Sequence, residues 1–420
     1  MGSSLAVLDG LSGIRGWQEE FYWDLHRHPE LSHQEHRTAG KVSERLRQAG
    51  FDVHEGVGGT GVVGVLGNGD GPTVLLRADM DALPVREATG LPYASSATAT
   101  DRNGDEVPVA HACGHDVHVA CLVGAAALLA AGTGAWSGTV IALFQPAEEA
   151  ADGAQGMVDD GLADLIPVPD VVLGQHVLSA PAGRLGTRSG PVLSAADSLR
   201  ITVHGRGGHG SMPHATVDPV VLAAMIVVRL QTVVSRETPP GEVAVLTVGS
   251  IQAGTRSNVI PDTAELQLNL RCYSERTRRR ILDAVRRIVD AECRASGCPR
   301  EPEFELFDSF PLTSNDPAAT DRVARAFAGF FGDRAQTMDR QTASEDFSVI
   351  PAALGAPYTY WGLGGIDMDG ADMDAGNDAP VNHSPAFAPV VQPTLDTGTQ
   401  ALVVAALAWL GRSPAAGPPH

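Results

Sequence analysis

Four short segments of the sequence carry side chains that bind divalent metal ions well. Together they supply one thiol, three imidazoles and two adjacent carboxylates, at Cys113, His115, Glu148, Glu149, His176 and His383. Zn²⁺ prefers a ligand set of thiolate, imidazole and carboxylate, and Mn²⁺ or Co²⁺ can share it. Two neighbouring carboxylates can divide their tasks, because one can bind metal while the other takes a proton from a nearby water. The set therefore predicts a two-metal hydrolase.

Each segment has an ordinary structural explanation when it is taken alone. A single Cys-x-His pair is usually a buried thiol beside a histidine, a Glu-Glu pair is usually a solvated helix face, and His-Ser-Pro is usually a turn. The flanking sequence favours the functional interpretation. Glu148 and Glu149 follow a β-branched apolar run at residues 137–144, and His176 follows a similar run at 169–174. Such runs indicate buried strands, and active-site groups of open α/β sheets gather at the carboxyl ends of strands.

A third apolar run, at residues 71–76, leads into the segment R-A-D-M-D-A-L-P, which contains Asp79 and Asp81. An aspartate at that sheet edge can accept the second ring N–H of a metal-binding histidine and fix its tautomer. A plain turn is the alternative, because Asp and Pro are both turn residues.

These motifs, in this order, resemble the amidohydrolase branch of the aminoacylase and carboxypeptidase metallohydrolases. That branch includes indoleacetyl-amino-acid hydrolases, hippurate hydrolases and N-acetyl-diaminopimelate deacetylases. The resemblance extends over residues 17–387, nearly the whole chain. Its motifs are A-D-M-D-A-L-P, H-A-C-G-H-D, Q-P-A-E-E, G-Q-H, G-R-G-G-H-G-S-M-P-H, S-N-V-I-P, S-E-D-F and N-H-S-P-A-F. Such an ordered series is specific for a family and uninformative about substrate.

The resemblance implies a role for each chemical group at the predicted centre. It implies that Cys113 bridges two ions and that Glu148 is the general base and acid. Asp81 corresponds to the aspartate that supports a metal-binding histidine, and Asp79 stands where related peptidases carry a metal-binding His. The implied metal ligands are Cys113, His115, Glu149, His176 and His383.

Three residues farther along the chain correspond to substrate contacts in this family: His209, Asn258 and Arg271. The resemblance implies that His209 reaches the active site of a dimer partner, where it can stabilise a developing oxyanion. The guanidinium of Arg271 pairs well with a carboxylate. Without the resemblance, His209 is a capping residue in a glycine-rich loop and Arg271 is a solvated charge at a strand end.

The predicted activity is hydrolysis of the amide bond of an N-acyl amino acid, or a close analogue, with two divalent ions (Zn, Mn or Co) per subunit. A dipeptidase or carboxypeptidase of the same family is the enzymatic alternative. A metal-retaining dimeric protein without catalysis is the alternative from another class. The resemblance implies a homodimer and leaves a tetramer open.

The predicted fold is α/β, with a sheet-and-helix catalytic domain of a metal-dependent hydrolase and an inserted, smaller α+β dimerisation or lid domain. A chain of 420 residues exceeds what one core usually holds, so two domains are expected. The pattern of strands and helices changes near residue 192 and returns near 310. We therefore expect catalytic parts at 1–191 and 308–420, an insertion at 192–307, and a flexible tail from about 412.

The net charge of −20 argues against nucleic acid and anionic membrane surfaces as partners. The longest apolar stretch, residues 117–131, is too short to span a bilayer and indicates a buried helix. The sequence does not begin with the basic and apolar segments of a signal peptide, so we expect a cytoplasmic protein. Five cysteines, an odd number, fit a reducing compartment better than a disulfide framework. A disulfide between Cys293 and Cys298 remains open. The acidic segment 367–378 lacks the terminal Glu of a calcium loop and is interpreted as a solvated loop.

Overall fold

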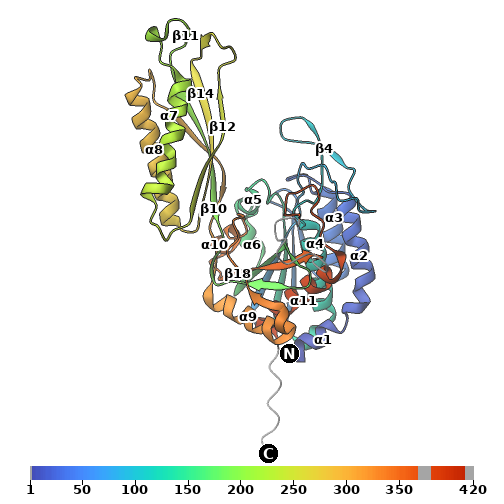
Figure 1. Cartoon of the computed structure of the whole chain (residues 1–420). Coiled ribbons are helices and arrows are strands. Elements are labelled where there is room, and N and C mark those ends of the chain that lie inside the picture. Colours follow the sequence, from blue (N-terminus) through green and yellow to red (C-terminus); the bar gives the residue numbers. More distant parts are fainter. Residues whose placement is uncertain (1, 368–379, 412–420) are drawn as a thin grey trace, which may run out of the picture. The chain divides into compact units, whose positions relative to one another are not determined.

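The computed structural model describes residues 2–367 and 380–411, and the chain forms two compact units (Figure 1). Unit 1 comprises Met1–Val192, Ser314–Arg340 and Asp346–His420, and unit 2 comprises Leu193–Thr313 and Gln341–Glu345. The second division lies later than the predicted residue 307, because β15 (Glu303–Phe310) continues the sheet of unit 2 across that position. The predicted tail and all but the first residue of the acidic segment 367–378 lie outside the described residues.

Unit 1 is built on an eight-stranded mixed sheet in the order β1-β2-β6-β3-β7-β18-β8-β17, which confirms the predicted α/β class. The four central strands β6, β3, β7 and β18 run parallel. They are covered on both faces, which explains why they occur in the sequence as continuous apolar runs. The strands are β1 (Asp52–Val57), β2 (Gly61–Asn68), β3 (Thr73–Asp79), β6 (Gly138–Gln145), β7 (Val171–Pro181), β8 (Leu185–Thr187), β17 (Ala335–Thr337) and β18 (Tyr358–Ile366).

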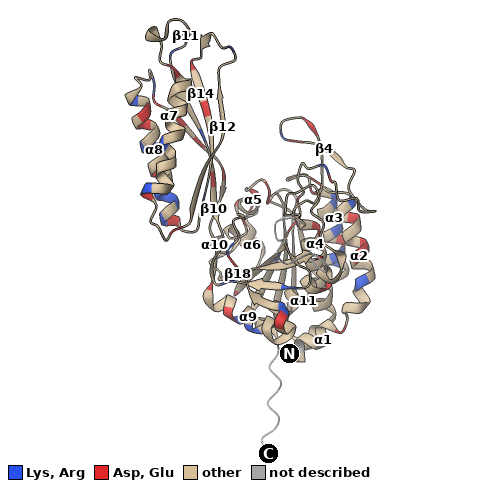
Figure 2. Ribbon diagram, viewed as in Figure 1, with Lys and Arg blue, Asp and Glu red and all other residues tan. Residues whose placement is uncertain are grey.

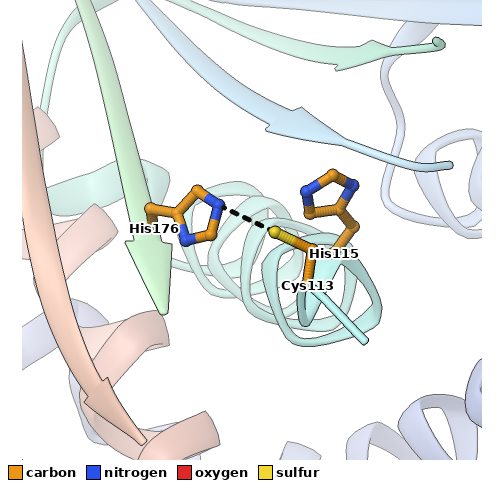
Figure 3. A group of neighbouring side chains, drawn as sticks. All are labelled: Cys113, His115 and His176. Carbon is orange, nitrogen blue, oxygen red and sulfur yellow. Dashed lines mark hydrogen bonds between the residues drawn. The ribbon is translucent and has the colours of Figure 1, made fainter. Parts of the chain in front are cut away.

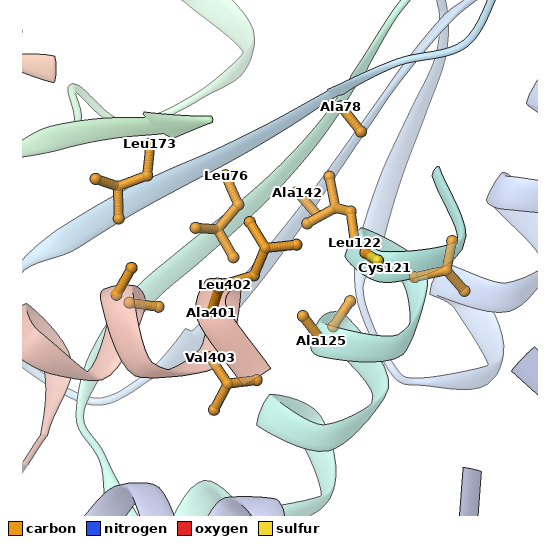
Figure 4. Packing of buried hydrophobic residues seen from close by; sticks show 14 of the residues in the cluster. Leu76, Ala78, Cys121, Leu122, Ala125, Ala142, Leu173, Ala401, Leu402 and Val403 are labelled. Atoms are coloured by element: carbon orange, nitrogen blue, oxygen red, sulfur yellow. The ribbon is translucent and has the colours of Figure 1, made fainter. Parts of the chain in front are cut away.

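Two apolar helices, α4 (His115–Ala131) and α11 (Val391–Leu410), pack against the central strands of unit 1 (Figure 4). Small and aliphatic side chains such as Cys121 and Ala125 on α4 meet Leu76 and Ala142 on the strands, and all four are fully buried. A helix that is apolar on every side is a buried helix, as predicted for residues 117–131. The remaining elements of this unit are α1 (Gly2–Leu8), α2 (Leu11–Arg27), α3 (His36–Gln48), β4 (Thr98–Thr100), β5 (Glu106–Pro108), α5 (Gly153–Asp159), α6 (Leu162–Leu165), α9 (Pro317–Phe331) and α10 (Val349–Leu354).

Unit 2 has the element order β-α-β-β-α-β, with a four-stranded antiparallel sheet in the order β12-β14-β10-β15. This is the ferredoxin-like arrangement, with both helices on one face of the sheet (Figure 1). Along β14 every second residue, from Ala264 to Cys272, is buried beneath those helices. The other elements of the sheet and its helices are β10 (Ala195–His204), α7 (Pro219–Thr232), β12 (Ala244–Ala253), β14 (Thr263–Cys272) and α8 (Glu275–Ala295). The chain passes between the units at β9 (Gly190–Leu193), at β16 (Thr313–Asn315) and on either side of Gln341–Glu345.

The α7 helix and its π-helical continuation Val233–Glu237 together are long and apolar enough to cross a membrane. One such helix is weak evidence for a membrane span, because core helices pass the same test of length and composition. Here one face of α7, including Leu222 and Ile226, is fully buried in unit 2. The opposite face leaves Val221 59% and Val228 68% exposed. The helix is therefore part of the unit 2 core and also carries an uncovered apolar surface.

All five cysteines are free thiols, so no disulfide joins Cys293 to Cys298 in this structure. The two residues lie at the end of α8, where the Cys298 N–H donates to the Cys293 carbonyl over 3.0 Å. Between them Gly297 has a φ of +70°, which completes a Schellman-type helix end. Their closeness in sequence is explained by this helix terminus.

Candidate metal centre and active site

Three strands of unit 1 end, or pass, at the same edge of the sheet and carry chemical groups there. Asp79 is the last residue of β3, and the segment that carries Glu148 and Glu149 follows the end of β6 at Gln145. The prediction that a strand ends just before His176 is wrong, because β7 runs from Val171 to Pro181 and contains it. The pairing of β3 with β7 ends at Arg77 and Gly174, so His176 still lies at the level where β3 ends.

The structure brings the predicted ligands of unit 1 together. Cys113 Sγ lies 3.5 Å from His176 Nε2, and Figure 3 shows His115 turned toward the same space. His383 Nε2 lies 3.3 Å from Glu149 Oε1. The His115 Nε2 atom is 3.9 Å from Glu149 Oε1 and 4.0 Å from Glu148 Oε2. Residues more than 200 positions apart in sequence thus converge on one small volume.

The donor atoms of this cluster fit divalent metal ions. His115 Nε2 is buried and has no hydrogen-bond partner among the described residues, which is costly unless a cation satisfies it. Two ligand atoms that each lie about 2.1 Å from one ion are separated by roughly 3.4 Å, close to the distances observed here. Each of three groups of ligands has its donor atoms within 4.8 Å of one another: Cys113, His115 and His176; Cys113, Glu149 and His383; His115, Glu148 and Glu149.

The electrostatics of the cluster also favour positive charge. Burial acts to lower the pKa of His115, but the negative charges of Asp79 and Cys113 raise it well above its ordinary value. Hydrogen bonds to Cys113 and Glu149 raise the pKa of His383 to about 10. The anionic groups therefore stabilise cations at these nitrogens, and a metal ion can take the place of the protons.

Asp81 lies behind His115, as predicted. His115 Nδ1 donates to the Asp81 carbonyl over 2.9 Å and to Asp81 Oδ1 over 3.2 Å, which directs the Nε2 lone pair toward the cluster. The other carboxylate oxygen, Oδ2, accepts the Glu149 N–H over 3.0 Å and the Ser32 hydroxyl over 2.7 Å. Burial acts to raise the pKa of Asp81, and the bond from His115 lowers it overall.

Asp79 forms a hydrogen bond with a second histidine, His118. Its Oδ1 accepts from His118 Nδ1, and the Val177 N–H donates to His118 Nε2 over 2.8 Å. Because both ring nitrogens of His118 are used, it cannot also bind metal in this arrangement. Arg77, which is fully buried, pairs with Asp79 and holds the pKa of that carboxyl well below its usual range despite burial. Asp79 and His118 therefore fix the backbone directly after His176.

The segments that carry these groups have unusual backbone conformations. Among the described residues, the non-glycine residues with positive φ are His33, Ala147, Ala151 and His383, and all four lie in site segments or beside them. Such conformations cost on the order of 1–3 kcal/mol each and cluster at functional sites. Only glycine fits at position 153, two residues after Ala151, because a Cβ there would lie 1.7 Å from the Pro146 carbonyl oxygen. The loop that carries Glu148 is therefore tightly folded.

In unit 2, the structure places His209 and Asn258 side by side. The short strands β11 (Gly208–His209) and β13 (Val259–Ile260) pair, and the Gly210 N–H donates to the Asn258 carbonyl over 2.8 Å. His209 is exposed, and its Nδ1 accepts the Ser211 N–H over 3.1 Å. That bond leaves the ring proton on Nε2, so His209 presents a hydrogen-bond donor to its surroundings.

Arg271 lies at the far end of β14 from that pair. Its Nε donates to Asn269 Oδ1 over 3.1 Å, and its Nη1 donates to the Thr342 carbonyl over 2.8 Å. Its Nη2 carries no hydrogen bond to the part of unit 2 that the structure describes. The guanidinium is therefore held in place with one donor arm available to a ligand.

Comparison with known proteins identifies the family. The model of peptidase family M20/M25/M40 matches residues 75–384, well over half of the chain. The chain belongs to peptidase family M20/M25/M40. This membership confirms the resemblance inferred from the motifs, and it confirms that the protein is a hydrolase.

Relatives within the M20/M25/M40 family cover most of the chain. Thermostable carboxypeptidase 1 of Saccharolobus solfataricus is 38% identical over 84% of this chain and 86% of its own length. Hippurate hydrolase of Campylobacter jejuni is 35% identical over 83% of this chain and 88% of its own length. The crystal structure of the Bacillus subtilis YXEP protein, a dinuclear metal binding peptidase of the M20 family, superposes with a TM-score of 0.76 at 28% identity and covers 94% of this chain and 98% of that one.

The structure adds residues to the site that the sequence analysis did not identify. His118 lies in the apolar stretch 117–131, and its position three residues after His115, which places both on one helix face, was the available signal. Asn382 donates to the Cys113 carbonyl over 3.2 Å and to the Val177 carbonyl over 3.0 Å, which joins two ligand segments. Its position directly before His383 was the available signal.

Proposed function

We propose that this protein is a binuclear metal-dependent amidohydrolase that removes the acyl group from N-acyl amino acids or close analogues. The observation that carries the proposal is the convergence of thiol, imidazole and carboxylate donors around the His115 Nε2 atom, which is buried and has no hydrogen-bond partner among the described residues. Two relatives support it: one is named a hippurate hydrolase, and the YXEP protein is a dinuclear metal binding peptidase.

Five residues would hold the ions, because their donor atoms fall into overlapping groups within 4.8 Å of one another. When bound, divalent ions supply Lewis-acid charge that polarises a carbonyl and lowers the pKa of a nearby water. The ligand set suits Zn²⁺, Mn²⁺ or Co²⁺. The ligands are Cys113, His115, Glu149, His176 and His383.

Glu148 performs the proton transfers in this mechanism. Its carboxylate is almost fully buried beside His115, and the neighbouring Glu149 is occupied as a ligand. Glu148 accepts a proton from the attacking water and then returns that proton to the amine nitrogen as the amide bond breaks. One carboxylate thus serves as base and then as acid.

We assign Arg271 to the substrate carboxylate, and His209 and Asn258 to the acyl oxygen. Arg271 and the His209–Asn258 pair lie at opposite ends of β14, which has 10 residues. At about 3.3 Å per residue the strand is roughly 30 Å long, so one small substrate cannot touch both ends of it in the same chain. A single active site that uses all three residues must therefore draw them from two copies of the chain.

A homodimer meets that requirement, and unit 2 offers a surface for it. The exposed side of α7 carries valines and Met225 and almost no charge, whereas α8 is rich in arginine and glutamate (Figure 2). Beside it, β12 is the edge strand of the sheet and leaves Val245 and Ile251 about half exposed. An exposed apolar patch next to an open sheet edge is suited to pairing with a second copy. We place the dimer in the cytoplasm, which suits five free thiols.

A carboxypeptidase is the second candidate, because the relative with 38% identity carries that name. Both activities require a free carboxylate on the substrate, so Arg271 serves either one. They differ in the acyl side of the amide bond, which is an aminoacyl group in a peptide and a simple acyl group in an N-acyl amino acid.

The test is release of amine by the purified protein from N-acetyl, N-benzoyl and N-indoleacetyl amino acids alongside dipeptides. We expect cleavage of N-acyl amino acids that is lost on chelation and restored by Mn²⁺, Zn²⁺ or Co²⁺. Preferential cleavage of dipeptides would favour the carboxypeptidase. No turnover by protein with a full complement of bound metal would contradict both and favour a non-catalytic role.

A further inference from the structure

Glu35 makes contacts that reach the loop of the proposed catalytic base, although no chemistry has been assigned to it. Its side chain is completely buried in unit 1, just before α3. One carboxylate oxygen, Oε1, accepts the His33 N–H over 3.0 Å and the Ala147 N–H over 2.9 Å. The other, Oε2, accepts the Thr60 hydroxyl over 2.6 Å. Burial and the charge of Asp81 raise the pKa of Glu35, and these hydrogen bonds act in the opposite direction because they stabilise its charged form.

The two N–H groups that share Oε1 belong to residues in strained conformations. His33 has a φ of 66° and Ala147 a φ of 52°, a region that non-glycine residues adopt only when the surroundings impose it. Glu35 is therefore a common anchor for two strained turns that are more than 100 residues apart in sequence. Without it, both turns could relax toward ordinary backbone conformations.

Glu148 lies directly between two anchored backbone groups. The N–H before it, of Ala147, is held by Glu35, and the N–H after it, of Glu149, is held by Asp81 over 3.0 Å. We infer that Glu35 is a positioning residue whose carboxylate fixes the Pro146–Ala147 peptide, and with it the backbone that leads into Glu148, and so aims that side chain at the reacting atoms. This inference rests on the proposed function, because it takes Glu148 to be the base.

The magnitude can be anticipated from what misplacement does to catalysis. A shift of about 1 Å in a catalytic group costs roughly 100-fold in rate. We expect Glu35→Ala to lower kcat about 10- to 100-fold, with KM changed less than about threefold, because Glu35 touches neither substrate nor the proposed ligand side chains. Glu35→Gln keeps an oxygen for both N–H groups, so it should retain kcat within about fivefold.

The decisive experiment is a double-mutant cycle with Glu148→Ala, in protein with bound metal measured for every variant. If Glu35 acts through Glu148, Glu35→Ala should lower kcat in the wild-type background and have almost no further effect once Glu148 is removed. Equal losses in both backgrounds would overturn the inference, because they would show a general structural role. Retained kcat in Glu35→Ala would overturn it as well.

Glu30 provides a matched control in the same region. Its carboxylate also accepts two backbone N–H groups, from Arg37 over 2.9 Å and Thr38 over 2.8 Å, at the start of α3. Glu30→Ala should lower Tm as Glu35→Ala does and leave kcat within about twofold. Should Glu35→Ala fail to fold, the cycle is repeated with Thr60→Val, which removes one bond to Glu35, and the same two outcomes decide it. A wild-type protein that binds metal and hydrolyses nothing would refute the proposed function instead.

Discussion

Two loops carry proposed catalytic groups, and they are held in different ways. The loop after β6 in unit 1, which carries Glu148, is fixed by buried carboxylates: Glu35, Asp81 and Asp346 accept the N–H groups of Ala147, Glu149 and Ala154. The loop after β10 in unit 2, which carries His209, is fixed mainly by backbone pairing with the segment before β14. Glu148 is buried, whereas His209 is exposed.

The difference shows which of the two side chains, Glu148 or His209, is held entirely by contacts within its own unit. Buried ionic anchors fix a side chain to within a fraction of an ångström and exclude water, as proton transfer at a metal centre requires. A glycine-rich loop with an exposed imidazole has a fixed tautomer but no described contact that uses its Nε2 donor. The Glu148 loop is therefore fixed by contacts within unit 1, whereas the His209 loop has an exposed donor that is suited to the proposed site of another molecule.

The largest expected effect comes from the buried loop. Glu148→Ala should lower kcat by about 10²- to 10⁴-fold, because it removes the proton acceptor and donor. Metal content should stay unchanged, since the five ligands remain. The measurement combines steady-state kinetics with metal analysis of the purified variant, and Glu148→Gln serves as the control of similar shape. Full activity in either variant would show that the base has been assigned wrongly.

The exposed loop allows a sharper test of the comparison. His209→Ala should lower kcat by about 10²- to 10³-fold, the range for loss of an oxyanion donor. Mixing His209→Ala with Glu148→Ala under conditions of subunit exchange should restore about a quarter of wild-type activity, because half of the dimers are mixed and each has one intact site. No recovery, despite mixed dimers shown by mass spectrometry, would mean that His209 acts in its own subunit or not at all.

The next largest effect is expected from mutations in the exposed apolar face of α7 in unit 2, which should disrupt the proposed dimer. Replacing Val221 and Val228 together by Glu places two like charges on the exposed face of α7 and should yield a monomer by light scattering. The monomer should keep its metal but have activity no greater than that of His209→Ala. Arg279→Glu on α8 is a matched charge change at an exposed position and should leave the dimer intact. A double variant that stays dimeric would place the interface elsewhere.

The strands beneath the proposed ligands could be predicted because continuous apolar runs are local signals. Continuous apolar runs give β3, β6 and β7, and the acid, thiol or imidazole that follows each run shows where the strands meet. His383 was predicted by family resemblance, because no local pattern links it to residues 200 positions earlier. The end of β7 was misplaced because the strand continues into polar residues that pair with β18.

The supporting residues could not be predicted for a physical reason. Glu35 and His118 contact backbone groups that are distant in sequence, and Arg77 pairs with the carboxylates of Asp79 and Asp346. The same residue types usually lie on solvated surfaces. Their roles appear only when burial and partner are both known. The exposure of one face of α7 could not be predicted either, because its sequence is apolar on both the buried and the exposed side.

The smallest expected effect tests whether buried charge also stabilises unit 1 next to the proposed metal ligand His115. His26 is buried between two carboxylates, with Nδ1 2.7 Å from Asp116 and Nε2 3.1 Å from Glu87. Burial acts to lower the pKa of His26, but the bonds to Asp116 and Glu87 raise it to about 9. Because the folded pKa exceeds the unfolded value, the contribution of His26 is complete below about pH 6.5 and disappears as the pH rises through 9.

Its size is on the order of 3 kcal/mol, from a pKa difference of about 2.5 at 1.36 kcal/mol per pH unit. The Tm of the wild type should therefore fall between pH 6.5 and 9.5 more steeply than the Tm of His26→Gln, with metal content held equal. If the two Tm profiles stay parallel, His26 is neutral in the folded protein and the ionic triad adds no stability. If the two Tm profiles converge at high pH, the protonated imidazole stabilises the part of unit 1 next to the proposed metal ligands. The His209 loop of unit 2 is held instead by backbone pairing.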